Sequence, residues 1–175
     1  VASRLSILTL TLFLALIGTV GWLIAPSYIA TFQPTLRDHQ TLRFTPNATG
    51  GYDVSEADFH FERALDEKGC SQVEFTFPFY GETYTEIHIS HSGAIGLDQP
   101  PPLNDLQAPF VRTPTILPLL LDLTPDPAEE DSGLYIRREP EQLIVTWNRL
   151  LALAQPETRY TFQTILYADG TFEFT

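Results

Sequence analysis

The 175-residue chain has one cysteine, no methionine and few basic side chains, and each scarcity excludes something. Because Cys70 stands alone, no internal disulfide can form and no C-x-x-C pair is available for metal or redox chemistry. The lack of methionine, even at the start, favours a fragment or a processed form. With 10 basic against 22 acidic side chains the formal net charge is −12. This argues against nucleic acid as a partner, because phosphate binding depends on Lys and Arg.

Charged residues are unevenly distributed along the chain. None occurs from Leu5 to Leu36, whereas all 22 acidic residues lie downstream of this run. We therefore divide the chain into a membrane anchor at residues 1–30, a linker and first strand region at 31–57, and a β-rich domain at 58–175. The chain ends inside an expected strand, which suggests that this domain is truncated at its C-terminus.

Residues 5–25 predict a transmembrane helix. As a helix this apolar stretch would span about 31 Å, close to the thickness of about 30 Å of a hydrocarbon core. Aromatic residues with a polar atom near the end of the run suit the headgroup region. We expect the residues in contact with the bilayer to include Leu5, Phe13, Trp22 and Tyr28.

Two other interpretations of this segment stay open. One is a cleaved secretory signal, although its apolar region is normally only about 7–15 residues long and small side chains precede the cut. Here Tyr28 stands at the third position before a cut after Ala30. The other is a buried core helix. Only Arg4 precedes the run, so the flanking charges determine the orientation of the segment in the membrane poorly.

We favour an extracytoplasmic β domain, either periplasmic or at the cell surface. Large domains translocate largely regardless of their charge, so the acidic β domain is compatible with this orientation.

The downstream sequence has the pattern of short strands. Apolar residues alternate with polar ones, and Gly, Pro, Asn and Asp separate the alternating stretches, with no long helical stripe. Hairpins are expected at Glu139–Glu141 and at Asp169–Gly170, the latter a strong turn signal. The expected strands are residues 58–63, 73–79, 84–91, 94–97, 133–138, 142–147, 160–167 and 172–174.

Strands without intervening helices predict a mainly β fold, an antiparallel β-sandwich preceded by the N-terminal transmembrane helix. Aromatic residues at period two normally fill the space between the sheets of a sandwich. The expected core residues are Phe75, Phe77, Ile87, Ile89, Val145, Trp147 and Phe162.

Two features are candidates for ligand contact. The connection from Gln99 to Pro114 is long, and such loops either bind ligands or simply cross between sheets; Asn104 and Asp105 are its candidate contacts. Tyr80 could belong to an aromatic platform if its ring is exposed, but core packing is the usual role of such rings. The sequence does not choose between these roles.

The densest acidic run lies between Thr124 and Ser132. Its candidate calcium ligands are Asp126, Glu129 and Asp131, because calcium prefers carboxylate oxygens. The run lacks the ligand alternation, central glycine and terminal glutamate of an EF-hand. A solvated acidic turn is therefore the alternative that we favour, and we expect no cofactor.

No catalytic set is evident. His88 and His91 are three residues apart, so on one strand they would face opposite sides and could not share a metal. Ser90 lacks the G-x-S-x-G context of a nucleophile, and Cys70 has no base near it in the sequence. We expect a protein that is not an enzyme.

The sequence FTFPFYG at residues 75–81 resembles the opening motif of nidogen-like (NIDO-type) modules, which are β-rich units of extracellular proteins, including bacterial surface proteins. Ser92 stands where the family usually has asparagine, and Leu120 where it has an aromatic residue. The resemblance spans residues 58–175 and continues in order through 84–95, 114–123, 133–135, 143–148 and 162–174.

This resemblance implies an extracellular recognition or adhesion module without agreed catalytic residues. Its partners would be the lipid bilayer, through the N-terminal helix, and an extracellular protein, glycan or small ligand. The alternative is the extracytoplasmic sensory input domain of a transmembrane receptor of the kinase or cyclase type. A receptor would need a second hydrophobic span after Thr175, whereas a tethered adhesin would not.

Overall fold

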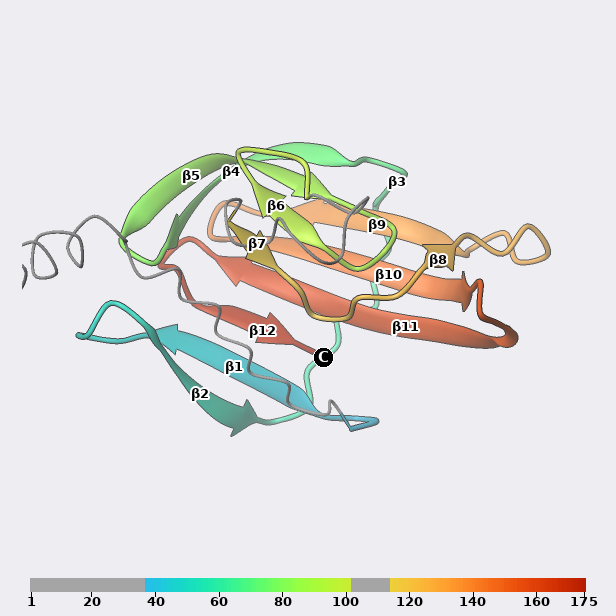
Figure 1. The fold of residues 1–175 in the computed structure, drawn as a ribbon, viewed down its shortest axis with the longest axis horizontal. Coiled ribbons are helices and arrows are strands. Elements are labelled where there is room, and N and C mark those ends of the chain that lie inside the picture. The colour runs from blue at the N-terminus through green and yellow to red at the C-terminus, as the bar shows by residue number, and fades with distance from the viewer. Residues whose placement is uncertain (1–36, 102–113) are drawn as a thin grey trace, which may run out of the picture. The chain divides into compact units, whose positions relative to one another are not determined.

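The computed structural model describes residues 37–101 and 114–175, and they form antiparallel strands without a helix, so the mainly β prediction is confirmed. Within these ranges no helix is long and apolar enough to cross a bilayer. The expected transmembrane segment, with Leu5, Phe13, Trp22 and Tyr28, lies outside the described residues. The strands in Figure 1 are β1 (Thr41–Pro46), β2 (Tyr52–Ala57), β3 (Glu67–Lys68), β4 (Gln72–Phe79), β5 (Glu82–Ile89), β6 (Ile95–Leu97), β7 (Thr115–Ile116), β8 (Leu123–Thr124), β9 (Gly133–Arg138), β10 (Gln142–Ala152), β11 (Gln155–Tyr167) and β12 (Phe172–Phe174).

The larger of two sheets has eight strands in the order β2-β1-β12-β11-β10-β9-β3, with β8 paired to β10. Strands β9 to β12 are neighbours because short turns join them. In the β11–β12 turn Gly170 has a φ of +89°, and the Tyr167 N–H donates to the Thr171 carbonyl at 2.9 Å. The Glu139 N–H donates to the Gln142 carbonyl at 2.9 Å and closes the β9–β10 turn. Both predicted hairpins are confirmed.

The smaller sheet has four strands in the order β4-β5-β6-β7. A two-residue turn joins β4 to β5, and both of its residues, Tyr80 and Gly81, have a positive φ, as a type I′ hairpin turn requires. The β4–β5 pairing shifts register between Glu74 and Phe77. This shift is a β-bulge, which bends the strand and increases its twist.

Side chains of the two sheets share one hydrophobic core. Trp147 and Phe162 of the large sheet stack with ring centroids 4.7 Å apart, and the indole Nε1 of Trp147 donates to the Ser90 carbonyl at 2.8 Å, just after β5 of the small sheet. The ring of Phe77 in β4 contacts Phe172 in β12 edge-on at 6.4 Å. All predicted core residues are buried: Phe75, Phe77, Ile87, Ile89, Val145, Trp147 and Phe162.

Residues 58–66 form no strand, so the strand predicted over residues 58–63 is wrong. This segment joins β2 to β3, which lie at opposite edges of the large sheet. It crosses the face of that sheet turned away from the core, and we call it the outer strap. Phe59 in the strap is 50% exposed.

Side chains of the sheet replace the neighbouring strand that the strap lacks. The His60 N–H donates to Thr41 Oγ1, and the Glu62 N–H donates to Gln163 Oε1, both at 3.0 Å. The amide nitrogen of Gln163 donates in return to the Glu62 carbonyl at 2.9 Å. These bonds satisfy the His60 N–H and both backbone groups of Glu62 without strand pairing, which explains the failure of the prediction.

Candidate recognition surface

Of the predicted ligand contacts the structure describes Tyr80, whereas Asn104 and Asp105 lie outside the described residues. Tyr80 occupies the β4–β5 turn with a φ of +49°, and its side chain is 38% exposed. Asn-Gly is the usual pair in such a turn, because a positive φ is unfavourable for a bulky side chain. The fold therefore holds an exposed aromatic ring at a strained position.

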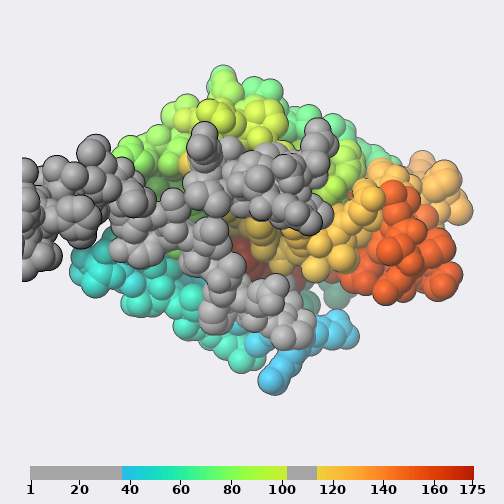
Figure 2. All heavy atoms as spheres, viewed as in Figure 1, coloured from blue at the N-terminus to red at the C-terminus, as the bar shows by residue number. Residues whose placement is uncertain are grey.

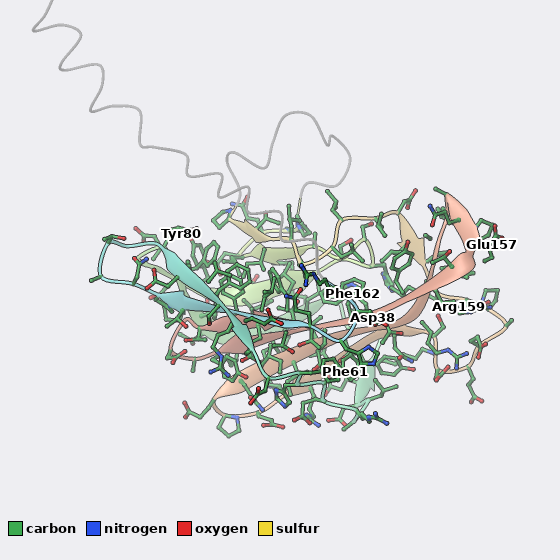
Figure 3. All side chains as sticks on the ribbon, turned by 90° about the horizontal axis from the view of Figure 1, so that it is seen from below. Asp38, Phe61, Tyr80, Glu157, Arg159 and Phe162 are labelled. Carbon is green, nitrogen blue, oxygen red and sulfur yellow. The ribbon has the colours of Figure 1, made fainter. Side chains whose placement is uncertain are left out.

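Two aromatic rings hold Tyr80 in place. Phe79 contacts it edge-on at 4.7 Å, and Tyr52, from the start of β2, contacts it edge-on at 5.2 Å. Figure 3 shows Tyr80 beside the turn end of the β1–β2 hairpin. We call Tyr52, Phe79 and Tyr80 the aromatic cluster.

Tyr52 connects the β1–β2, β4–β5 and β11–β12 turns. Its hydroxyl donates to the Gly170 carbonyl at 3.1 Å, and the Pro78 carbonyl lies 3.5 Å away. A Cβ on Gly170 would come within 2.9 Å of the Pro78 carbonyl oxygen, so the turn approaches β4 too closely for a side chain. Burial raises the pKa of both Tyr52 and Tyr80 above the ordinary value, so both hydroxyls stay protonated at neutral pH. The cluster offers an uncharged aromatic surface and no nucleophile.

A groove of about 640 Å³ lies beside the bulge in β4. Glu74, Glu86 and Glu139 line it together with a single basic residue, Arg138. One guanidinium nitrogen of Arg138 lies 3.4 Å from the Glu74 carbonyl oxygen. The groove is thus polar, with a net negative lining.

His88 and His91 line one smaller groove of about 460 Å³. The expectation that they face opposite sides of one strand is wrong, because β5 ends at Ile89 and His91 lies in the turn that follows. The Ser92 N–H donates to Ser90 Oγ at 3.1 Å within this turn. No group of three His, Cys, Asp or Glu side chains that could hold a metal occurs in the described part of the chain.

The three calcium candidates form ion pairs with arginines. Asp126 Oδ2 lies 2.5 Å from a guanidinium nitrogen of Arg159, and Arg149 pairs with Glu129 at 2.8 Å and with Asp131 at 3.5 Å. The N–H of Ala128 and then Arg159 lower the pKa of Asp126, against the effect of burial. These carboxylates hold the acidic turn against the β10–β11 hairpin, in which Figure 3 labels Arg159.

Two further side chains with reactive or acidic groups, Cys70 and Asp98, have structural partners. The Cys70 thiol donates to the Gln72 carbonyl at 2.9 Å. Asp98 Oδ1 accepts the N–H groups of Glu86 and Thr85, both at 2.9 Å, and these bonds lower its pKa. Asp98 has a φ of +55° and thus takes part in the chain reversal after β6.

Sequence reasoning missed Tyr52, which joins the aromatic cluster from a segment considered only as a linker and first strand. Its hydroxyl contact with Gly170 spans 118 positions, so local periodicity carries no trace of it. The positive φ of Tyr80 was easier to predict from the sequence. Tyr-Gly stands between two alternating stretches, which is the spacing of a two-residue hairpin turn.

Comparisons with known proteins agree with the fold. The family model described as NIDO related matches residues 37–175, a range that starts before the resemblance seen from residue 58 and that includes β1 and β2. The comparison with curated proteins and the comparison with solved structures gave no match. The match covers most of the chain and indicates an extracellular recognition-type module. The chain therefore belongs to the NIDO-related family.

Proposed function

We propose that this protein is a membrane-anchored recognition or adhesion module without catalytic activity, whose β domain faces the extracytoplasmic side. The observation that carries the proposal is the family match over residues 37–175. The anchor rests on the uncharged run from Leu5 to Leu36, which is long enough to cross a bilayer as a helix.

The aromatic cluster supports a recognition role. Tyr80 keeps a large ring partly in solvent at the cost of an unfavourable φ, and such strained positions are often functional. Aromatic rings offer large, rigid contact areas at low entropic cost. The partner is an extracellular protein, a glycan or a small ligand, and the net charge of −12 disfavours nucleic acid.

A non-catalytic role agrees with the hydrogen bonds and ion pairs that the candidate reactive side chains form within the protein. The Cys70 thiol, the Asp98 carboxylate and the acidic turn all bond to groups of the protein itself. The two tyrosines of the aromatic cluster keep their protons. Recognition needs only a surface, and the aromatic cluster provides one.

Membrane fractionation tests the proposal. The full gene is expressed with a tag after the β domain, membranes are extracted with carbonate, and intact cells or spheroplasts are treated with protease. We expect the protein to stay in the carbonate pellet and its β domain to be cleaved from outside. A soluble product that begins near Thr31 would contradict anchoring, and protection from external protease would contradict the orientation.

The gene sequence downstream of residue 175 provides a second test. Further binding modules there would support the recognition or adhesion role. A second span of about 20 apolar residues followed by a kinase or cyclase domain would replace it with the sensory role, because an adhesive module has no use for that connection.

A further inference from the structure

In the part of the chain that the structure describes, the two sheets have two long free edges. β2 ends the large sheet with six residues, and β4 ends the small sheet with eight, whereas the strands at the opposite edges, β3 and β7, have two residues each. Figures 1 and 2 show β2 at the lower border of the described strands. A free edge offers unpaired N–H and C=O groups to another strand.

The edge at β4 is blunted in three ways. A bulge interrupts its pairing between Glu74 and Phe77, Pro78 lacks an N–H, and Arg138 lies 3.4 Å from the Glu74 carbonyl oxygen. Bulges, prolines and covered backbone groups are the usual means by which proteins prevent pairing at an edge. A further strand could pair with β4 only after disrupting these features.

The edge at β2 has none of these features. Its pairing with β1 is unbroken from Tyr52 to Ala57, and it contains no proline. Within residues 37–101 and 114–175, no side chain bonds to the backbone of residues 53–57. Among the described residues, the backbone groups of β2 that point away from β1 are therefore open to a further strand.

One side of β2 continues the aromatic cluster. Val54 pairs with Phe44 of β1, whose side chain is in the core, yet Val54 is 38% exposed. Tyr52 lies two residues before Val54 on the same side of the strand and contacts Tyr80. An added strand would cover Val54 and end against the aromatic cluster.

Charge decides what could pair with this edge. β2 carries Asp53 and Glu56 and no basic residue. Side chains alternate between the two sides of a strand, so Glu56 lies on the side of Val54, and Asp53 lies on the other side. Opposite charges on directly facing residues of neighbouring strands attract, so each carboxylate favours a strand with Lys or Arg at the facing position.

We propose that β2 binds an extended, basic segment of a partner protein by strand addition, with the basic side chains facing Asp53 and Glu56 and apolar ones facing Val54 and the aromatic cluster. This inference specifies the partner of the proposed recognition role and rests on it. Backbone hydrogen bonds would supply affinity and the alternate side chains would supply specificity, as in other cases of strand addition.

A synthetic probe tests the proposal. The full chain in detergent micelles is titrated at about 150 mM salt, where the Debye length is about 8 Å, with a fluorescent peptide of sequence Thr-Lys-Thr-Val-Lys-Val-Thr, called the Lys–Val peptide. Paired antiparallel with β2, this peptide places Lys opposite Glu56 and Asp53, and Val opposite Val54 and Tyr52. We expect saturable binding and slower hydrogen exchange of the amides of residues 52–57. The same peptide with Glu in place of both Lys residues should not bind. Absence of binding by the Lys–Val peptide would overturn the proposal.

Two controls separate strand addition from general attraction to an acidic protein. The double substitution D53K/E56K should weaken binding by about tenfold or more, whereas E130K/E157K, with the same charge change at exposed positions elsewhere, should leave it nearly unchanged. Lys–Val peptides N-methylated at alternate residues keep their charge, and methylation on the pairing edge should abolish binding to the unaltered protein. Equal loss in both double variants, or undiminished binding by both N-methylated peptides, would overturn the proposal.

These measurements are independent of membrane fractionation. If the peptide experiments fail while the β domain is anchored and exposed, recognition uses another surface and the role of β2 is wrong. If fractionation fails while the peptide binds β2, the strand-addition site exists but the proposed placement of the protein is wrong.

Discussion

The two faces of the large sheet are both buried, but by opposite means. Its core face is apolar, with Trp147 and Leu134 fully buried against the small sheet. Its outer face is polar where the strap crosses it, yet Gln163, Thr146 and Glu173 are each no more than 2% exposed. One face is stabilised by removing apolar surface from water, and the other by satisfying each polar group that it buries.

Glu173 shows how the outer face accommodates a charge. Arg43 pairs with it at 2.5 Å, and the Tyr167 hydroxyl donates to its second oxygen at 3.1 Å. Burial, assisted by the charge of Glu173, raises the pKa of Tyr167 to about 12, so this hydroxyl remains a donor. A buried carboxylate with such partners is costly to disrupt, because removal of a partner leaves an uncompensated charge.

The largest expected effect comes from the core between the sheets. Phe77→Ala should lower the free energy of unfolding by about 3–5 kcal/mol, because a fully buried ring is lost and a cavity remains. Denaturant unfolding of the full chain measures the change. Phe59→Ala in the strap is the matched control, and since Phe59 is 50% exposed it should cost much less. Equal losses would mean that the strap packs as a core element.

A smaller loss is expected where the strap bonds to the outer face. Gln163→Leu removes three hydrogen bonds, two to the Glu62 backbone and one to Thr146, and should cost about 2–3 kcal/mol, because buried groups are left without partners. Hydrogen exchange should accelerate at the Glu62 amide. Gln155→Leu, an exposed position in the same strand, should have little effect. A neutral Gln163→Leu would show that the strap does not depend on these bonds.

The ion pair of the strap predicts an acid dependence. The hydrogen bond from Arg137, followed by that from His60, lowers the pKa of Glu62 below its ordinary value of 4.5. A carboxylate with a lowered pKa stabilises the fold above its unfolded pKa, and this contribution is lost as the pH falls through the folded value. Glu62→Gln should therefore cost about 0.5–1 kcal/mol near pH 7 and progressively less as the pH falls below 4.5 toward 3. Unfolding measured at both pH values tests this, and a loss independent of pH would contradict it.

The smallest expected effect is a gain. Thr164 lies fully buried on the core face, and its hydroxyl has no hydrogen-bond partner among the residues that the structure describes. Thr164→Val keeps the shape and removes the unsatisfied group, so it should raise the free energy of unfolding by about 0.5–1 kcal/mol. Thr146→Val on the outer face is the contrasting control, because Thr146 accepts from Gln163 and should lose stability. A loss at Thr164 would show that its hydroxyl has a partner after all.

Local alternation predicted most strands because it reflects a local requirement. In β4, Phe75 and Phe77 alternate with exposed residues, and in β5 the buried Ile87 and Ile89 flank His88, which is only half-buried. One buried face is enough to impose this period of two, whichever sheet supplies the opposite side. The Asp169–Gly170 turn was equally predictable, because its conformation depends on residues that are adjacent in the sequence.

The same alternation failed in the strap because its partners are remote. Glu62 bonds to Gln163, 101 positions away, and nothing between residues 58 and 63 indicates that these amides bond to side chains. The candidate site has the same dependence, because Tyr80 could be named from its sequence motif but its contact with Tyr52 requires the β1–β2 hairpin to lie beside the β4–β5 turn.

The amino-acid sequence alone determined the mainly β class, the two hairpin turns, the interior residues and the family resemblance, because each depends on local periodicity, turn chemistry or ordered motifs. The tertiary structure decided which polar residues are buried, which sheet edge is open and which carboxylates are paired. These properties arise when segments about a hundred residues apart come into contact, as Arg43 and Glu173 do. Burial and charge pairing depend on such contacts, and a local pattern contains no information about them.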